Sequence, residues 1–381
     1  MKILLVGEYS RLHNSLKEGL VALGHTVTIV GCGDRFKKFE TDLSIAPKII
    51  ANNRFFRFLN KFSIRVLKLD LERLEKGIRF KKILPTLKNY DVVQLINSDA
   101  IGTFPKWEIK LYQKLFLQNK KKYLLICGED TPIIEVCLKN NLKYSALTPY
   151  LENKKLKKYF SFSLKYISKP YRKLFDFIEK NCDGFIVSDL DYKIPMSQTS
   201  IACTLIPNPI NLDLLPYQEM KITDKIVIFH GINPLSSIKK GNHFFEKALT
   251  IIKEKYQDKI EIITAVSVPY KEYIELYNKA HILLDMVYSY DQGYNALEAM
   301  AKGKVVFTGA ETEFETYYNL KERVNINAKP NVDSLVHELS YLIENPNEIL
   351  AISKRARKFI EQEHHYVKIA EKYVSKWNIK T

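Results

Sequence analysis

The 381-residue sequence contains no run of about 18 apolar residues, so we expect no helix that spans a membrane. It has only five cysteines, which are scattered and form no Cys-x-x-Cys pair. This pattern argues against a disulfide framework and against structural zinc, and it favours a reduced cytoplasmic chain with core cysteines. Gly7 and Glu8 interrupt the apolar start after a few residues, which predicts a buried first strand and not a signal peptide.

Several signature motifs are also missing. The chain has no Gly-x-x-x-x-Gly-Lys-Ser/Thr, which argues against a phosphate-loop NTPase. Zinc-finger spacing, an RNP-like strand and a basic zipper are absent too, so only net charge favours nucleic-acid binding. The one Asp-x-Asp, Asp189 to Asp191, follows a predicted strand, and we interpret it as surface or linker. No metal site is expected.

Acidic residues are scarce in one half of the chain. There are 59 Lys and Arg against 43 Asp and Glu, a formal net charge of +16, and residues 1–200 carry all of it. Residues 201–381 sum to zero. This asymmetry predicts two domains that face different partners.

Two segments of the basic half have helical spacing and many aromatic residues. In residues 53–87, apolar side chains recur on one stripe, and residues 51–90 sum to +8. Residues 154–180 mix Lys and Arg with seven Phe and Tyr. Both are predicted to be basic amphipathic helices that dock on an anionic membrane, the alternative being ordinary surface helices. The stripe in the first segment consists of Phe55, Leu59, Phe62, Val66 and Leu69.

Strand and helix patterns alternate along the chain. Short apolar runs predict strands, and the segments between them have the three-to-four-residue periodicity of helices. The alternation is interrupted near Pro207–Pro209, which predicts an α/β protein with two doubly wound, Rossmann-like domains facing across a cleft. We expect an N-terminal domain at 1–207 and a C-terminal domain at 208–361, with a last helix at about 362–381 packing back onto the first domain. The strands are expected at 2–6, 25–30, 92–96, 123–127, 184–187, 204–206, 226–229, 260–265, 282–287 and 305–308.

The most specific segment is residues 288–309, YSYDQGYNALEAMAKGKVVFTG. A glycine-containing loop enters a helix that carries a glutamate one turn in, followed by small residues, Gly303 and a short strand. This arrangement resembles the nucleotide-sugar signature of retaining GT-B glycosyltransferases, notably glycosyltransferase family 4. A helix N-terminus offers backbone N–H groups to a diphosphate, and a carboxylate one turn later can accept hydrogen bonds from ribose hydroxyls.

The resemblance assigns donor-binding roles in this segment. Glu298 would bind the ribose, and Gly293, Tyr294, Asn295 and Ala296 would cradle the diphosphate. The family's earlier acidic position holds Tyr290 here, with Asp291 beside it as a candidate replacement. The alternative from spacing alone is that Asn295 caps the helix and Glu298 completes a capping box.

A second match is the segment from His230 to Gly241. Family members place an Arg after a strand-ending glycine and a Lys before the next glycine, and both cations contact the diphosphate. Gly231 and Lys240 fit this pattern, whereas the Arg position holds Pro234 or a neighbour. The alternative is a solvated lysine pair that precedes a helix.

Two N-terminal loops complete the candidate site. The first loop resembles the acceptor-side loop of the family, and its candidates are Gly7, Ser10, His13 and Asn14, with His13 also a catalytic candidate. After a later strand, Glu129 and Asp130 are candidate catalytic carboxylates that would bind sugar hydroxyls or stabilise an oxocarbenium-like centre. The alternatives are a structural histidine and an Asp130 helix cap.

The resemblance implies a retaining hexosyltransferase that needs no cofactor. The donor would be a UDP- or GDP-linked sugar, and the acceptor a hydroxyl of a glycan or lipid-linked sugar. Pro209 replaces the glycine of the family's linker and would stiffen the interdomain crossing. We expect a role in cell-envelope polysaccharide synthesis, a cytoplasmic location with peripheral attachment to the inner membrane face, and no nucleic-acid partner. The alternatives are a nucleotide-sugar epimerase on the same fold and a basic nucleic-acid-binding protein.

Overall fold

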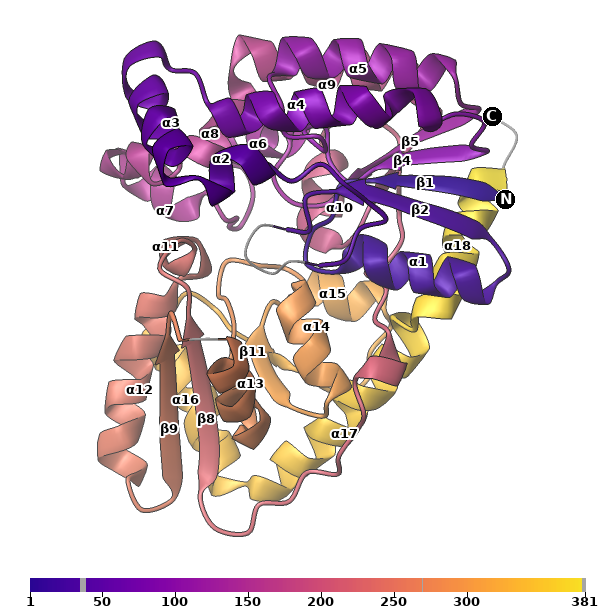
Figure 1. The fold of residues 1–381 in the computed structure, drawn as a ribbon. Helices are drawn as coiled ribbons and strands as arrows, with labels where there is room; N and C mark the ends of the chain where they lie inside the picture. The colour runs from indigo at the N-terminus through magenta and orange to yellow at the C-terminus, as the bar shows by residue number, and fades with distance from the viewer. Residues whose placement is uncertain (35–38, 269, 379–381) are drawn as a thin grey trace.

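The computed structural model describes residues 1–34, 39–268 and 270–378, and in this part the chain forms two fully parallel sheets (Figure 1). The seven-stranded sheet has the order β3-β2-β1-β4-β5-β6-β7, and the five-stranded sheet the order β12-β11-β10-β8-β9. We call each sheet with its helices the N-terminal and the C-terminal domain. The predicted α/β architecture with two doubly wound sheets is confirmed.

The N-terminal sheet is covered on both faces, which explains why its strands are continuous apolar runs. Helices α1 and α18 cover one face, and α4, α5 and α9 cover the other (Figure 1). The strands are β1 (Lys2–Val6), β2 (Thr26–Gly31), β3 (Leu43–Ser44), β4 (Val92–Leu95), β5 (Lys121–Ile126), β6 (Gly184–Val187) and β7 (Cys203–Leu205). The helices are α1 (Leu12–Ala22), α2 (Lys48–Asn52), α3 (Arg54–Leu67), α4 (Leu71–Ile83), α5 (Pro105–Leu117), α6 (Thr131–Leu138), α7 (Thr148–Glu152), α8 (Ser161–Leu164), α9 (Lys169–Asn181) and α10 (Leu190–Met196).

The C-terminal domain repeats this alternation around a single large core. Its strands are β8 (Ile226–Ile232), β9 (Ile260–Val266), β10 (Ile282–Leu284), β11 (Val305–Thr308) and β12 (Ile326–Asn327). Its helices are α11 (Ser237–Lys240), α12 (Asn242–Tyr256), α13 (Tyr270–Lys279), α14 (Tyr294–Ala301), α15 (Thr312–Tyr317), α16 (Val332–Glu344) and α17 (Pro346–Glu363). The chain then returns to the first domain as α18 (Tyr366–Asn378).

The chain crosses between the domains twice, and hydrogen bonds join the two crossings. The Ile210 N–H donates to the His364 carbonyl at 2.7 Å, and the Tyr366 N–H donates to the Ile210 carbonyl at 3.2 Å. Beyond this point α18 packs against α1, where Gly19 lets the backbones approach: a Cβ there would lie 2.4 Å from the Tyr366 carbonyl oxygen. The predicted boundary at 207 lies between β7 and β8, and 379–381 of the predicted last helix lie outside the described residues.

The first basic segment, predicted as one helix-like stretch, is two helices. Lys68 adopts the left-handed conformation (φ 54°) at the end of α3, and Asp70 starts α4 by accepting a hydrogen bond from the Glu72 N–H. This break turns α3 away from α4, so the apolar stripe does not continue into the core. Phe55 and Phe62 are exposed.

The second basic segment differs from the prediction of a membrane-docking helix. Of its seven aromatic residues, four are buried in the core of the N-terminal domain, while its lysines other than Lys165 are exposed. The alternative of ordinary surface helices therefore describes residues 154–180 better. The four buried aromatics are Phe160, Tyr166, Tyr171 and Phe175.

Two expectations from what the sequence lacks can be compared with the described residues. Among them, no helix is both long and apolar enough to cross a bilayer. All five cysteines are free thiols; Cys137 is buried, and the others are partly exposed and so are less deep than predicted.

Candidate functional site

The start of α14 forms the centre of the candidate donor site. Gly293 is the N-cap residue in an extended conformation, and no side chain caps the helix. The Ala296 N–H donates to the Gly293 carbonyl at 3.0 Å, so the groups that an anion would meet are the Tyr294 and Asn295 N–H groups at the positive end of the helix dipole. The capping box considered from the sequence does not form, because the cap position belongs to Gly293 and not to Asn295.

Lys240 is held beside this helix start by a buried aspartate. Its Nζ donates to Asp285 Oδ1 at 2.8 Å, and Asn295 Nδ2 donates to the same oxygen at 3.2 Å. Asp285 follows β10 and is 2% exposed, so its ion pair with Lys240 holds the ammonium group beside the start of α14. A cation and a helix N-terminus at one place suit a diphosphate. The sequence predicted Lys240 and Asn295 as site residues but not Asp285. Its position directly after a strand could have indicated that it lies at the edge of the sheet where ligands bind.

Glu298 lies one turn into α14 and is partly exposed. Arg11, from the opposite domain, interacts electrostatically with it. Tyr294 joins the domains more directly: its hydroxyl lies 2.7 Å from Ser15 Oγ on α1 and donates to the Pro209 carbonyl at 2.8 Å. The predicted ribose ligand therefore lies where the two domains meet, and Tyr294 is an interdomain contact.

Asp291 is also at the domain interface. Its Oδ2 accepts a hydrogen bond from the Leu190 N–H at the start of α10, and its Oδ1 accepts one from the Gln292 N–H. Burial raises the pKa of Asp291 to about 7. The structure thus gives this candidate replacement for the family's acidic residue a docking contact with the N-terminal domain, and its contact with donor stays a prediction.

The Asp-x-Asp motif was wrongly interpreted as surface or linker. Asp189 is 9% exposed, and Asp191 Oδ1 accepts a hydrogen bond from the Tyr290 N–H of the other domain at 2.7 Å. Ser289 Oγ donates to the second oxygen of Asp191. With Asp291 these residues form a buried carboxylate cluster between the domains; among the described residues no group of His, Cys, Asp and Glu has metal-site geometry.

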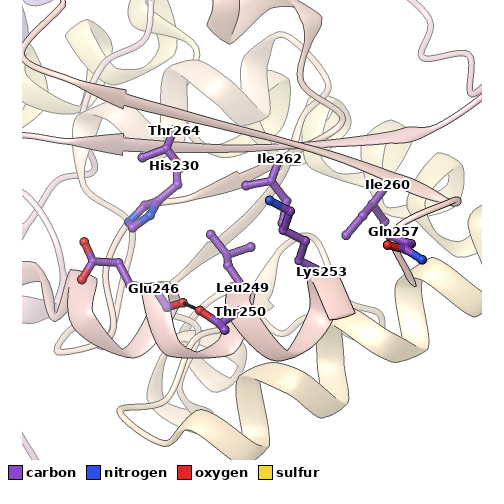
Figure 2. A pocket seen from close by; sticks show the side chains of 9 residues that line it. All are labelled: His230, Glu246, Leu249, Thr250, Lys253, Gln257, Ile260, Ile262 and Thr264. Carbon is purple, nitrogen blue, oxygen red and sulfur yellow. Dashed lines mark hydrogen bonds between the residues drawn. The ribbon is translucent and has the colours of Figure 1, made fainter. Parts of the chain in front are cut away.

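Gly231 and His230 lie at the end of β8 but on different sides. A Cβ at Gly231 would lie 2.9 Å from the Tyr273 ring, so the position needs a glycine. The His230 ring points toward α12 and an open groove of about 380 Å³ (Figure 2). Its Nε2 is 2.9 Å from Asn242 Nδ2, and burial lowers the pKa of His230 to about 4. His230 therefore does not supply the missing diphosphate cation.

The first loop of the N-terminal domain is organised around a fully buried His13. Its Nδ1 lies 2.8 Å from the Gly7 carbonyl oxygen, and its Nε2 lies 3.2 Å from Gln94 Nε2. Burial lowers the pKa of His13 to about 4, so the ring is neutral at pH 7. The structure places this predicted catalytic residue in the core, where it positions the loop and has no surface to offer a substrate. Of the two roles considered for His13, the structure favours the structural one.

Glu8, which the sequence did not single out, is a second buried polar residue of this loop. It is 3% exposed, and its Oε2 accepts hydrogen bonds from the Asn14 N–H (2.8 Å) and from Asn14 Nδ2 (2.6 Å). Its Oε1 has no hydrogen-bond partner among the described residues. Burial raises the pKa of Glu8 to about 8, so at neutral pH it is a carboxylic acid with a free O–H. Ser10 shapes the same loop, its N–H donating to Asp34.

The shifted pKa of Glu8 predicts a pH-dependent stability. The folded pKa of about 8 lies above the ordinary 4.5, so the contribution of Glu8 is fully present below pH 4.5 and is lost as the pH rises through 8. The free energy of unfolding of the wild type should therefore fall by on the order of a few kcal/mol as the pH rises. In Glu8→Gln, whose side chain has the same shape and stays neutral, we expect this fall to be absent. Denaturant unfolding from pH 5 to 9 measures it. Parallel pH profiles for the two proteins would contradict the assignment.

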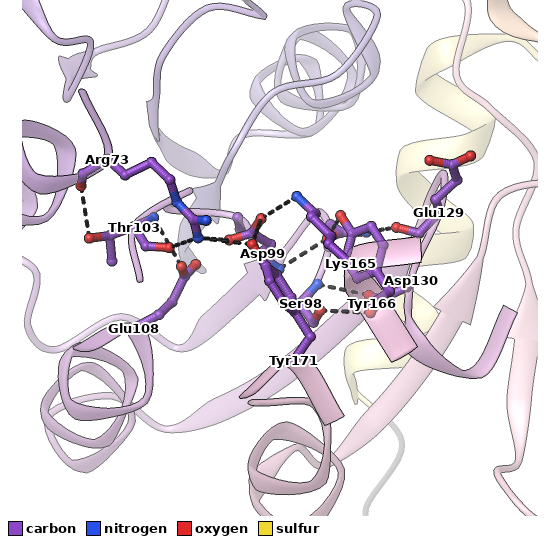
Figure 3. Close-up of polar contacts among 12 residues, drawn as sticks. Arg73, Ser98, Asp99, Thr103, Glu108, Glu129, Asp130, Lys165, Tyr166 and Tyr171 are labelled. Carbon is purple, nitrogen blue, oxygen red and sulfur yellow. Dashed lines mark hydrogen bonds and ion pairs between the residues drawn. The ribbon is translucent and has the colours of Figure 1, made fainter. Parts of the chain in front are cut away.

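Glu129 and Asp130 do not act as a pair. Glu129 Oε1 accepts hydrogen bonds from Lys239 Nζ (2.5 Å) of the C-terminal domain and from Ser163 Oγ (2.6 Å). Asp130 is fully buried, caps α6 through the Thr131 N–H and accepts hydrogen bonds from the Ser98 N–H and Ser98 Oγ (Figure 3). The structure thus gives Asp130 the helix-cap role that was the alternative, and it makes Glu129 part of an interdomain ion pair.

A further polar cluster lies at the carboxyl end of β4. Asp99 Oδ2 accepts a hydrogen bond from Lys165 Nζ at 2.7 Å and one from the Tyr171 hydroxyl at 3.3 Å, and Arg73 lies 3.8 Å from its other oxygen (Figure 3). Sequence reasoning missed this cluster, although the polar Asn97-Ser98-Asp99 after a predicted strand was its signal. It borders Glu129 through Asn97, whose Nδ2 donates to the Glu129 carbonyl.

Comparisons with known proteins identify the fold. Residues 235–375 match the family model described as glycosyl transferase-like. The structure is similar over 99% of the chain to sucrose-phosphate synthase from Thermosynechococcus elongatus, with a TM-score of 0.59, 13% identity and 98% of that chain covered. The fold is that of the GT-B glycosyltransferases.

Other solved structures share the GT-B fold. Anabaena Alr3699/HepE in complex with UDP and glucose has a TM-score of 0.58 at 11% identity, with 99% of both chains covered. A putative UDP-N-acetylglucosamine 2-epimerase from Listeria monocytogenes has a lower TM-score of 0.50 at 11% identity, over 98% of this chain and 94% of that one. A search of curated protein sequences finds no significant match.

Proposed function

We propose that the protein is a retaining glycosyltransferase that moves a sugar from a nucleotide diphosphate to an acceptor hydroxyl. The observation that carries the proposal is the start of α14, where an uncapped helix N-terminus, Lys240 and Glu298 lie together inside the segment that matches the glycosyl transferase-like family. These groups are suited to phosphates and ribose.

The chemistry follows from the groups at the domain interface. Lys240 and the α14 N–H groups would stabilise the charge that develops on the departing diphosphate. Glu298 would hold the ribose hydroxyls of the donor through its carboxylate. Closure around Tyr294 and the Lys239–Glu129 ion pair would keep water from the donor.

The acceptor is proposed to be a glycan or lipid-linked sugar at the cytoplasmic face of the membrane, in cell-envelope polysaccharide synthesis. Support comes from the charge: the domain opposite the donor site carries the whole net charge of the chain. Positive charge of this kind favours an anionic surface. The alternative is a nucleotide-sugar epimerase, which would change the sugar without any acceptor.

A donor panel tests the proposal. Thermal unfolding with UDP-, GDP-, ADP- and TDP-sugars is expected to show a higher Tm with one base, because a ligand that binds only the folded state stabilises it. With that donor, NMR of the products is expected to show an acceptor-dependent glycoside with the donor's anomeric configuration. An epimerised free nucleotide sugar formed without acceptor would favour the alternative, and an inverted glycoside would contradict retention.

A further inference from the structure

Helix α3 has its apolar side turned outward. The residues it buries are polar, Asn60 and Ser63, while its phenylalanines lie on the surface. Within α2 and α3 eight large apolar side chains are exposed, almost half of all those exposed in the described chain. They are Ile49, Phe55, Phe56, Phe58, Phe62, Ile64, Val66 and Leu67, and we call them the α3 patch.

Specific hydrogen bonds hold α3 in this orientation. Asn60 Oδ1 accepts a hydrogen bond from the Leu71 N–H at 2.7 Å, and Ser63 Oγ donates to the Leu69 carbonyl at 2.8 Å. Both bonds satisfy backbone groups at the turn into α4, where the next helix begins. The polar side of α3 therefore attaches the helix to the turn before α4. The helix cannot turn its phenylalanines inward without losing these hydrogen bonds.

A basic stripe runs beside the apolar one. Phe55, Phe58, Phe62 and Val66 recur every three or four residues, and so do the exposed Arg54, Arg57, Lys61 and Arg65. Residues 43–69 contain six Lys and Arg and no Asp or Glu. An exposed apolar patch of this size on a soluble surface marks an interaction site. With basic residues along its edge, it fits the boundary between anionic headgroups and acyl chains.

We propose that α3 is the element by which this protein docks on an anionic lipid surface, with the phenylalanines inserted below the headgroups and the arginines and lysines among the phosphates. Charge complementarity commits the patch to this occupant: a second copy of the chain would bring an equally basic face against it. The inference deepens the proposed function by assigning the acceptor's membrane contact to one helix. Residues 154–180, in which four of the seven aromatics are buried and Phe162 is the one exposed, offer no comparable patch.

The test is flotation of the full chain with vesicles, in low and high salt. Vesicles of phosphatidylcholine with one quarter phosphatidylglycerol are expected to bind the protein, and high salt is expected to release it from them. Vesicles of phosphatidylcholine alone are expected not to bind it. Phe58→Ser/Phe62→Ser is expected to lower vesicle partitioning about tenfold or more. Leu117→Ser/Val21→Ser is the matched control, because both residues are exposed and lie on other helices of the same domain.

The variant Arg57→Glu/Lys61→Glu tests whether vesicle binding depends on the basic residues of α3 or on the net positive charge of the whole domain. Its control is Lys110→Glu/Lys114→Glu on α5, an exposed pair with the same spacing and the same charge change. We expect the α3 variant to lose binding to the anionic vesicles and the α5 variant to keep most of it. Equal losses in the two variants, or equal binding of the wild type to both vesicle types, would overturn the proposal.

Two further readouts separate the remaining explanations. If the wild type is a dimer by light scattering and Phe58→Ser/Phe62→Ser is a monomer, a second copy occupies the patch and the membrane proposal fails. Glu298→Ala is expected to float like the wild type, because its change lies in the other domain. Donor binding measured on the same variant separates the two proposals. Wild-type affinity in Glu298→Ala would contradict the proposed donor site and leave the docking helix standing, whereas equal binding of the wild type to both vesicle types would contradict the docking helix alone.

Discussion

Glu298→Ala is expected to weaken binding of the nucleotide sugar about a hundredfold or more, because two hydrogen bonds from ribose hydroxyls to a carboxylate are lost. The fold should be unaffected, since Glu298 is a partly exposed helix residue and alanine favours the helix. Isothermal titration calorimetry with the donor selected by the panel measures the change.

The matched control is Glu254→Ala, an exposed glutamate on α12 of the same domain. It is expected to bind donor like the wild type, and both variants should keep the wild-type Tm without ligand. Wild-type affinity in Glu298→Ala would move the ribose site elsewhere and remove the main support for the donor assignment.

Lys240→Ala is expected to lower kcat about 10²- to 10³-fold, the usual cost of removing one group that stabilises a developing negative charge. The alanine also leaves Asp285 buried without its cation, which by itself destabilises the fold. The double variant Lys240→Ala/Asp285→Asn removes both charges and is expected to regain much of the Tm while staying inactive.

Steady-state kinetics and thermal unfolding of these variants separate the two effects. Lys247→Ala, an exposed lysine on α12, is the control and should match the wild type in both measurements. Recovery of activity together with Tm in the double variant would show that Lys240 serves only to pair with Asp285, and would exclude its proposed contact with the diphosphate.

The sequence predicted the fold well because buried parallel strands are continuous apolar runs. Every strand expected from the sequence is present, with ends shifted by a few residues; the two-residue strands β3 and β12 were missed because two residues show no periodicity. The motif at 288–309 likewise predicted the loop and helix of α14, since Gly293 and the small residues after it are local signals.

The candidate site was harder to predict where the role of a residue depends on its partner. His13 and Glu8 lie in one loop, and the chain alone does not show that the histidine is enclosed by Gly7 and Gln94 while the glutamate keeps an oxygen free. Asp130 and Glu129 are adjacent, yet one caps a helix and the other contacts Lys239, more than a hundred residues away.

The charge of the chain shows the same division. The sequence by itself determined that the net charge of +16 lies in residues 1–200 and that two basic, aromatic segments lie there. Only the tertiary structure decided that the two segments differ, because periodicity gives the stripe on a helix but not the direction in which it faces. In 154–180 four of the seven aromatics are buried in the N-terminal core, whereas Asn60 and Ser63 anchor α3 by its polar side and leave its phenylalanines exposed.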